Sequence, residues 1–108
     1  MKEIRAYIEP FMLAKLTQAL LEMPDFPGMS VSDCEGFGHV KIIAGRDYTP
    51  YVPKIRIEIF VTDELVESIL NTVMTIANTH QHGAGKVYVI NVEESARIST
   101  GERGNDLA

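Results

Sequence analysis

Residues 79–86, with the sequence THQHGAGK, combine residue types that can bind a phosphate group. Gly83 and Gly85 flank one small residue, so the backbone N–H groups of this segment can approach an anion closely. Lys86 follows at once and adds a positive charge suited to a phosphate. A glycine-rich turn followed by a surface lysine has the same pattern, so the segment alone leaves both interpretations open.

Histidines in the same segment raise a second kind of chemistry, because imidazole is a common ligand for Zn²⁺ or Cu²⁺. His80 and His82 stand two residues apart, and His39 lies elsewhere in the chain. No carboxylate or thiol stands beside the pair in sequence to act as a third ligand. We therefore expect these side chains to face a phosphate or the solvent, and we expect no metal site.

The composition is that of one globular domain that has no affinity for nucleic acid. The chain has 108 residues, 45% of them hydrophobic, and a formal net charge of −5. This length supports a single core, and an acidic balance does not favour phosphate backbones. The single cysteine, Cys34, cannot form an intrachain disulfide, and residues 1–11 lack the apolar core of a signal peptide.

We therefore expect a cytoplasmic protein. No apolar run approaches the ~20 residues that a membrane-spanning helix needs, so we expect no direct insertion into a membrane. No nucleophile stands with a base in a catalytic pattern, and the adjacent acids Glu93 and Glu94 would point to opposite faces of a strand. The sequence therefore predicts a protein that is not an enzyme.

Hydrophobic periodicity predicts strands at residues 2–9, 29–35, 54–61 and 86–92, with helices at 11–23 and 65–78. Thr62 is the expected N-cap of the second helix, followed by two acids in its first turn. The expected apolar helix faces are Phe11, Leu13, Leu16, Ala19, Leu20 and Met23 in the first helix, and Leu65, Val66, Ile69, Leu70, Val73, Met74, Ile76 and Ala77 in the second.

The order β-α-β, long loop, β-α-β is that of the ferredoxin-like arrangement, an α+β fold with two helices on one face of an antiparallel sheet. On the third strand, Ile55, Ile57 and Ile59 alternate with polar residues. The other face of the sheet would therefore carry Tyr7 from the first strand and Arg56 and Glu58 from the third. This mixture suits a subunit interface, and we expect a homo-oligomer.

Five segments of the chain resemble the PII family of nitrogen regulatory signal-transduction proteins. They are IEPF at 8–11, GFG at 36–38, PKIRIEI at 53–59, TxxxGxGKVYV at 79–89 and RIxTGE at 97–102. They occur in the family's order and near its spacing, and together they cover almost the whole chain. The resemblance implies a ferredoxin-like βαββαβ subunit, a homotrimer, and an adenine nucleotide (ATP, ADP or AMP) bound between neighbouring subunits.

The resemblance also implies roles for individual residues. Gly83, Gly85 and Lys86 would hold phosphates, and Arg97 would reach the phosphates from the adjacent subunit. The other implied nucleotide-site residues are Met29 and Ser30 lining the adenine pocket, Gly36 and Gly38 giving the ligand room, Glu58 on the strand beneath it, and Lys54 touching the phosphate or effector. No prosthetic group is implied, and the nucleotide acts as an effector.

Three positions depart from the family pattern. Val40 stands where the family usually has a glutamine that helps to hold Mg²⁺ and 2-oxoglutarate, which argues against magnesium-dependent 2-oxoglutarate sensing. Ser99 replaces the second arginine of an R-x-R pair, and Ala84 replaces an acidic residue of the phosphate loop. We therefore expect weak discrimination in favour of ATP, with ADP or AMP as alternatives.

The whole chain, 1–108, is expected to be one domain with three functional segments: a long partner-binding loop at 36–53, a phosphate-binding loop at 79–86 and a C-terminal segment at 97–108. Tyr48 and Tyr51 are the candidate partner contacts on the long loop, although the context of Tyr48 favours an ordinary exposed loop tyrosine. The resemblance implies a regulated protein target, for which a membrane transporter is a reasonable class. The alternatives are a trimeric metal-binding protein resembling the CutA group, and a small enzyme that acts on nucleotides.

Overall fold

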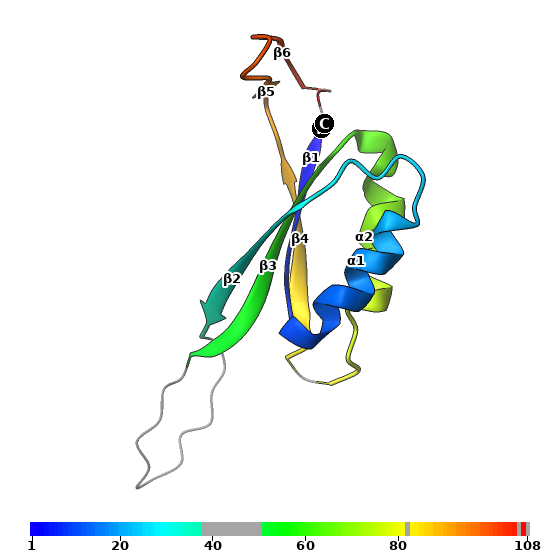
Figure 1. The fold of residues 1–108 in the computed structure, drawn as a ribbon, viewed down its shortest axis with the longest axis vertical. Helices are drawn as coiled ribbons and strands as arrows, with labels where there is room; N and C mark the ends of the chain where they lie inside the picture. The colour runs from blue at the N-terminus through cyan, green and yellow to red at the C-terminus, as the bar shows by residue number, and fades with distance from the viewer. Residues whose placement is uncertain (38–50, 82, 106, 108) are drawn as a thin grey trace, which may run out of the picture.

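The structure is a computed structural model that describes residues 1–37, 51–81, 83–105 and 107. Its main strands are β1 (Lys2–Ile8), β2 (Ser30–Gly36), β3 (Val52–Val61) and β4 (Gly85–Asn91), and its helices are α1 (Leu13–Leu21) and α2 (Val66–Ile76) (Figure 1). The 3-10 turns η1 (Pro10–Met12) and η2 (Asp63–Leu65) precede the helices, and a short hairpin of β5 (Ser95–Ala96) and β6 (Arg103–Gly104) follows β4.

The four main strands form one antiparallel sheet in the order β2-β3-β1-β4. Both helices lie on the same face of this sheet, and the other face, called the open face here, has none of the described elements over it (Figure 1). The expected α+β fold with two helices on one face is therefore confirmed. Among the described residues, no helix is long and apolar enough to cross a membrane.

The core lies between the sheet and the helices and follows the alternation of the strands. In β3, Ile55, Ile57, Ile59 and Val61 are buried, while the residues between them face the open side. Burial of such a side chain contributes about 2 kcal/mol, so this face anchors the sheet to the helices. The core residues are Ile4, Ala6, Ile8, Leu16, Leu20, Ile55, Ile57, Ile59, Val61, Ile69, Val73 and Ala77.

The segment expected as a loop at 36–53 is shorter at both ends, because its flanking residues extend the hairpin. Gly36 is the last residue of β2 and lies opposite Val52, the first residue of β3. Pro53 is tolerated inside β3 because at this point only β2 lies beside the strand, and β1 begins to pair at Ile55. Residues 38–50 lie outside the described residues.

The first helix is shorter than expected, and one of its expected core positions is exposed. Pro10 lacks an N–H group, so it ends β1 and opens a 3-10 turn in which the Met12 N–H donates to the Glu9 carbonyl at 3.0 Å. The tighter turn shifts the phase of the side chains before the α-helix begins. Phe11 therefore points outward and is 71% exposed, contrary to the expected apolar stripe.

The second helix also begins with a 3-10 turn and ends at Ile76, earlier than expected. Thr62 occupies the N-cap position, but its side chain makes no capping hydrogen bond, and its backbone carbonyl accepts from the Leu65 N–H instead. Asp63 forms an ion pair with the Met1 ammonium group at 3.0 Å. Met74, expected on the apolar face, is half exposed.

Candidate functional site

The segment from the end of α2 to the start of β4, called the glycine connection here, contains two glycines that the backbone requires for different reasons. Gly83 has a φ of +91°, and a Cβ there would meet no atom within 4 Å. Gly85 has a φ of +126°, and a Cβ there would lie 2.0 Å from the Tyr7 carbonyl oxygen. Lys86 begins a strand as the periodicity predicts, and Gly85, which was expected in the loop, joins the same strand: the two residues pair with Tyr7 and Ile8 at the start of β4. The expected phosphate loop therefore ends at Ala84.

Lys54 joins this connection to the ends of β1 and β2. Its ammonium group donates to the Gly83 carbonyl at 2.8 Å and forms an ion pair with the Glu9 carboxylate. The Lys54 side chain is only 15% exposed. A Cβ on Gly36 would lie 3.3 Å from the Lys54 Cγ, so the glycine leaves room for the lysine stem. Lys54, Glu9 and Gly83 are called the Lys54 cluster below.

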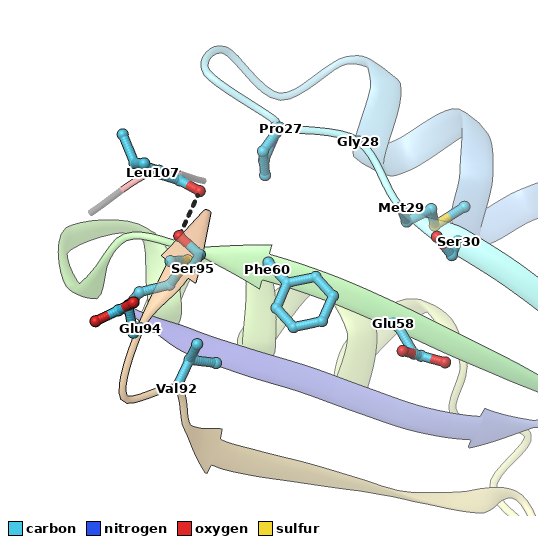
Figure 2. Close-up of a pocket in the computed structure, with 11 residues that line it drawn as sticks. Pro27, Gly28, Met29, Ser30, Glu58, Phe60, Val92, Glu94, Ser95 and Leu107 are labelled. Carbon is cyan, nitrogen blue, oxygen red and sulfur yellow. Dashed lines mark hydrogen bonds between the residues drawn. The ribbon is translucent and has the colours of Figure 1, made fainter. Parts of the chain in front are cut away.

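An open groove of about 620 Å³ lies at the other end of the sheet (Figure 2). Met29, Ser30 and Glu58, three of the residues expected around a nucleotide base, line it together with Phe60 and Val92. In Figure 2 the Phe60 ring lies between Ser95 on one side and Glu58 on the other. Grooves of this size are typical of small-molecule sites, and this one offers an aromatic face beside polar acceptors.

Carboxylates in and around this groove make it unsuitable for phosphate. Glu58 and Glu94 both line it. The Arg56 guanidinium pairs with Glu58 at 3.1 Å, and Arg103 pairs with Glu94, so each acid already has a cation as partner. A phosphate in the groove would meet two carboxylates, and both arginines among these four residues already pair with those carboxylates. The groove therefore suits the uncharged part of a ligand, such as a flat base with amino donors.

Arg97 lies in the turn of the β5–β6 hairpin, far from the glycine connection of the same chain. Its N–H donates to the Glu102 carbonyl at 2.9 Å, and its carbonyl accepts from the Gly101 N–H at 2.8 Å. Lys86 lies near the start of β4. The strand spans about 17 Å from Lys86 to Asn91, and the hairpin lies beyond Asn91. Figure 1 shows the hairpin and the α2–β4 connection at opposite ends of β4.

The expected site residues thus form separate groups in one copy of the chain. Gly36, Lys54, Gly83, Gly85 and Lys86 gather around the α2–β4 connection. The groove residues lie toward the opposite end of the sheet, and Arg97 lies beyond them. One copy of the chain therefore does not bring Lys86 and Arg97 together on the same small anion.

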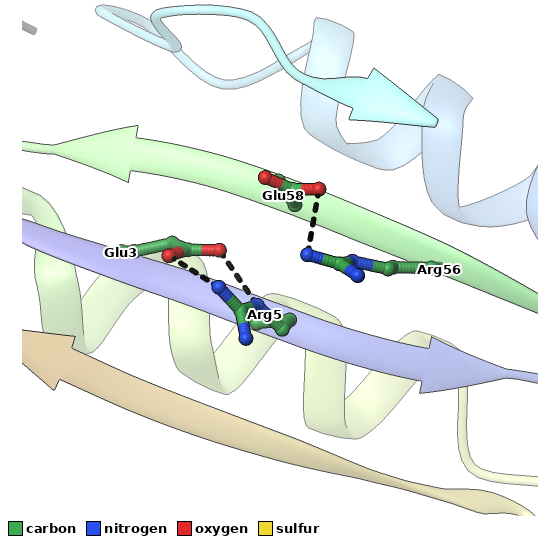
Figure 3. Close-up of polar contacts among 4 residues, drawn as sticks. All are labelled: Glu3, Arg5, Arg56 and Glu58. Carbon is green, nitrogen blue, oxygen red and sulfur yellow. Dashed lines mark hydrogen bonds and ion pairs between the residues drawn. The ribbon is translucent and has the colours of Figure 1, made fainter. Parts of the chain in front are cut away.

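The open face of the sheet carries two ion pairs on its central strands (Figure 3). Arg5 donates to the Glu3 carboxylate at 2.8 and 2.9 Å, and this hydrogen bonding is the main cause that raises the pKa of Arg5 above its ordinary value. Glu3 is buried although it lies on this face. The Arg56 Nε atom is buried without a hydrogen-bond partner within the described part of the chain.

Aromatic residues lie on the open face and beside the Gly36–Val52 pair, where β2 ends and β3 begins. Tyr7 and Tyr88 pack edge to face on neighbouring strands, with ring centroids 6.3 Å apart. Tyr51, an expected partner contact, is 53% exposed and lies against Phe37 with ring centroids 5.6 Å apart. The remaining two expected positions, Tyr48 and Gly38, lie outside the described residues.

Comparison with known proteins decides the family. The sequence model of the family described as "Nitrogen regulatory protein P-II" matches residues 1–102. The chain belongs to the P-II family. Nitrogen regulatory protein P-II of Bradyrhizobium diazoefficiens is 40% identical over 98% of both chains. The protein of the same name from Rhodospirillum rubrum is 39% identical over the same shares, and that from Klebsiella oxytoca is 39% identical over 94% of this chain and 95% of its own.

Membership in the P-II family assigns a class of function. P-II proteins are regulators that transmit signals to protein targets, and they are not enzymes. This P-II chain is therefore a signal-transduction regulator, as the motif resemblance predicted. The family match also favours this interpretation over the CutA-like alternative. Among the described residues, no group of three or more His, Cys, Asp or Glu side chains is placed to hold a metal ion.

Sequence reasoning missed Glu9 as part of the site in this P-II chain. The glutamate precedes Pro10 at the end of β1, a position that the pattern explains as a strand end. Its contact with Lys54 joins residues 45 positions apart in sequence. The sequence contained only an indirect indication of this contact. When β1 and β4 pair, Ile8 lies opposite Gly85, and this pairing brings Glu9 close to the glycine connection.

Proposed function

We propose that this P-II chain binds an adenine nucleotide between two copies of itself and that the bound state controls a protein partner. One observation carries the proposal: the residues suited to phosphate and the groove suited to a base lie toward opposite ends of one copy. A ligand that needs both can use them only where two copies meet. A nucleotide has this shape, with a flat base at one end and charged phosphates at the other.

The base would enter the groove beside Phe60. Its ring offers a stacking surface, and the Ser30 hydroxyl and Glu58 carboxylate can accept hydrogen bonds from an amino group. Met29 adds a polarisable side chain that adapts to a flat ring. Adenine presents an amino group of this kind, which supports an adenine nucleotide as the ligand.

The phosphates would lie at the glycine connection of the neighbouring copy. Gly83 leaves the backbone open to an anion, Gly85 allows the close approach to β1 that begins β4, and Lys86 is exposed beside them. Arg97 would approach from the other copy, because its own chain holds it far from Lys86. Since Ser99 supplies no second cation in the hairpin turn, ADP and AMP are expected to compete effectively with ATP.

The assembly that would close this site is a homotrimer built on the open faces of three sheets. The open face carries paired charges and half-exposed aromatic rings, including Tyr88 at 47% and Phe60 at 42% exposure. The buried Arg56 Nε atom lacks a partner within the described residues, so a neighbouring copy could supply an acceptor. A heterologous contact between the groove and hairpin of one copy and the glycine connection of the next can close into a ring, as a trimer requires.

The protein partner would contact the segment between β2 and β3, with Tyr51 at its described end. A membrane transporter is the target class that we propose, and the expected cytoplasmic location is part of this hypothesis. The ligand can change partner binding only through its different affinities for the two states of the protein. Tyr48 belongs to the same proposed contact segment.

Isothermal titration calorimetry of purified protein with ATP, ADP and AMP tests the proposal. We expect at least one nucleotide to bind, and Lys86→Ala to weaken ADP binding at least tenfold, because a charged hydrogen bond to phosphate contributes about 1.5–3 kcal/mol. Lys15→Ala is the matched control, since Lys15 is exposed on α1 and carries the same charge. Absence of binding, or equal binding by the Lys86→Ala variant and wild type, would contradict the proposal.

A further inference from the structure

We propose that Glu9 is a built-in competitor of the ligand. In the Lys54 cluster, its carboxylate pairs with the ammonium group of Lys54, and a nucleotide phosphate would compete with this carboxylate for the charge of the lysine. The contact is thus autoinhibitory and sets the affinity of the site. This inference rests on the proposed function of the glycine connection as a phosphate site.

The ammonium group of Lys54 already has two hydrogen-bond partners. A lysine ammonium group has three N–H donors. One donates to the Gly83 carbonyl at 2.8 Å and another to the Glu9 carboxylate. With Lys54 15% exposed and Glu9 28% exposed, the pair is largely shielded from water, so its charges are screened less than those of a surface pair.

Glu9 and Gly83 contact the same ammonium group, so a phosphate bound at Gly83 would lie close to the Glu9 carboxylate. Two like charges that share a site disfavour each other, whereas each is favoured by the lysine. Phosphate and Glu9 therefore compete for the charge of Lys54, and the ligand gains most from the lysine when the glutamate moves away.

This competition is linked to the β2–β3 hairpin. Lys54 lies two residues after the start of β3 at Val52, which pairs with the last residue of β2, Gly36. Gly36 in turn leaves the space that the Lys54 stem occupies. If a phosphate replaced Glu9 as the partner of Lys54, the contacts of this lysine in the β2–β3 hairpin would change. By reciprocity, a partner that favours the Glu9-bound arrangement lowers the affinity for the nucleotide by the same factor by which the nucleotide lowers the affinity for that partner.

Glu9→Gln tests the competition, because the amide keeps the shape of the side chain and removes its charge. We expect this variant to bind ATP about tenfold more tightly than wild type, a factor equal to about 1.4 kcal/mol. The gain should be smaller for AMP, which carries fewer phosphate charges. Glu67→Gln is the control for net charge, since Glu67 is exposed in the first turn of α2, at the far end of that helix from the glycine connection.

The same measurement in a Lys54→Met background separates competition from simple repulsion. If Glu9 acts by occupying Lys54, removal of its charge changes ATP affinity by less than twofold once the lysine is gone. A gain of the same size in both backgrounds would overturn the inference, because Glu9 would then act on the ligand directly. Thermal unfolding establishes that each variant is folded, and Glu9→Ala provides a second variant without the carboxylate.

The outcomes distinguish this inference from the proposed function. Tighter ATP binding by Glu9→Gln, lost with Lys54→Met and absent in Glu67→Gln, supports the inference. Unchanged or weaker binding by Glu9→Gln, with wild type binding ATP, overturns the inference and leaves the nucleotide site standing. If neither wild type nor Glu9→Gln binds any adenine nucleotide, the proposed function fails, and the inference fails with it.

Discussion

Replacement of Gly85 by alanine isolates what the backbone demands at the start of β4. The residue has a φ of +126°, a conformation that costs an L-residue about 1–3 kcal/mol. The added Cβ would also lie 2.0 Å from the Tyr7 carbonyl oxygen, so β1 and β4 must separate locally. Such overpacking adds about 1–3 kcal/mol, which gives a total loss on the order of 4 kcal/mol.

Gly83→Ala is the matched control, because its φ of +91° is also unfavourable but a Cβ there would meet open space. Its cost should be confined to the conformational part, about 1–3 kcal/mol. Urea unfolding of both variants and wild type, at equal protein concentration because assembly affects apparent stability, measures the difference. If Gly85→Ala destabilised the protein no more than Gly83→Ala, the argument from close approach would be refuted.

Two further predictions concern the fold. The Met1 ammonium group lowers the pKa of Asp63 below its ordinary value of 3.8, so the stabilisation is present above that value and is lost as pH falls through the lower folded pKa. Asp63→Asn should therefore be less stable than wild type at pH 7, with a gap that closes on acid titration followed by circular dichroism. Ile57→Ala should lower the free energy of unfolding in urea by about 2–5 kcal/mol, because Ile57 is fully buried. Val31 pairs with Ile57 in the sheet but is half exposed, so Val31→Ala should cost under about 1 kcal/mol. Equal costs for the two variants would contradict the assigned core.

The strands could be predicted well because their signal is local. In β3, alternation of isoleucines with charged residues assigns each side chain to a face, and the structure buries Ile55, Ile57 and Ile59 as predicted. The ends of strands were predicted less well, because they depend on pairing with distant residues. Val52 and Pro53 join β3 only because β2 continues to Gly36 beside them.

The helix errors have a geometric cause. A stripe drawn with 3.6 residues per turn assumes an α-helix from its first residue, whereas Phe11 lies in a 3-10 turn and faces outward. Met74 is exposed for a different reason: it lies on α2 near Val87 of β4, which is the last strand of the sheet in the described part of the chain. Propensity and periodicity do not report where a sheet ends.

The candidate site could be predicted as a set of residues but not as an arrangement. Motif resemblance named Lys54 and Lys86, and the structure brings both to the same end of the sheet. The motif resemblance could not indicate that Glu9 pairs with Lys54, because that contact forms only where three segments of the chain meet. The distance between Lys86 and Arg97 in one chain likewise emerges only from the direction of β4.

Subunit mixing tests the central claim, that Lys86 of one copy and Arg97 of another hold one nucleotide. Lys86→Ala and Arg97→Ala homo-oligomers should each bind ADP weakly. After both are unfolded together and refolded at equal amounts, about one quarter of the interfaces should carry both intact residues and bind ADP with wild-type affinity. Recovery of this fraction of tight sites by calorimetry is the predicted result, and a mixed sample that binds no more tightly than its two parents would contradict the account.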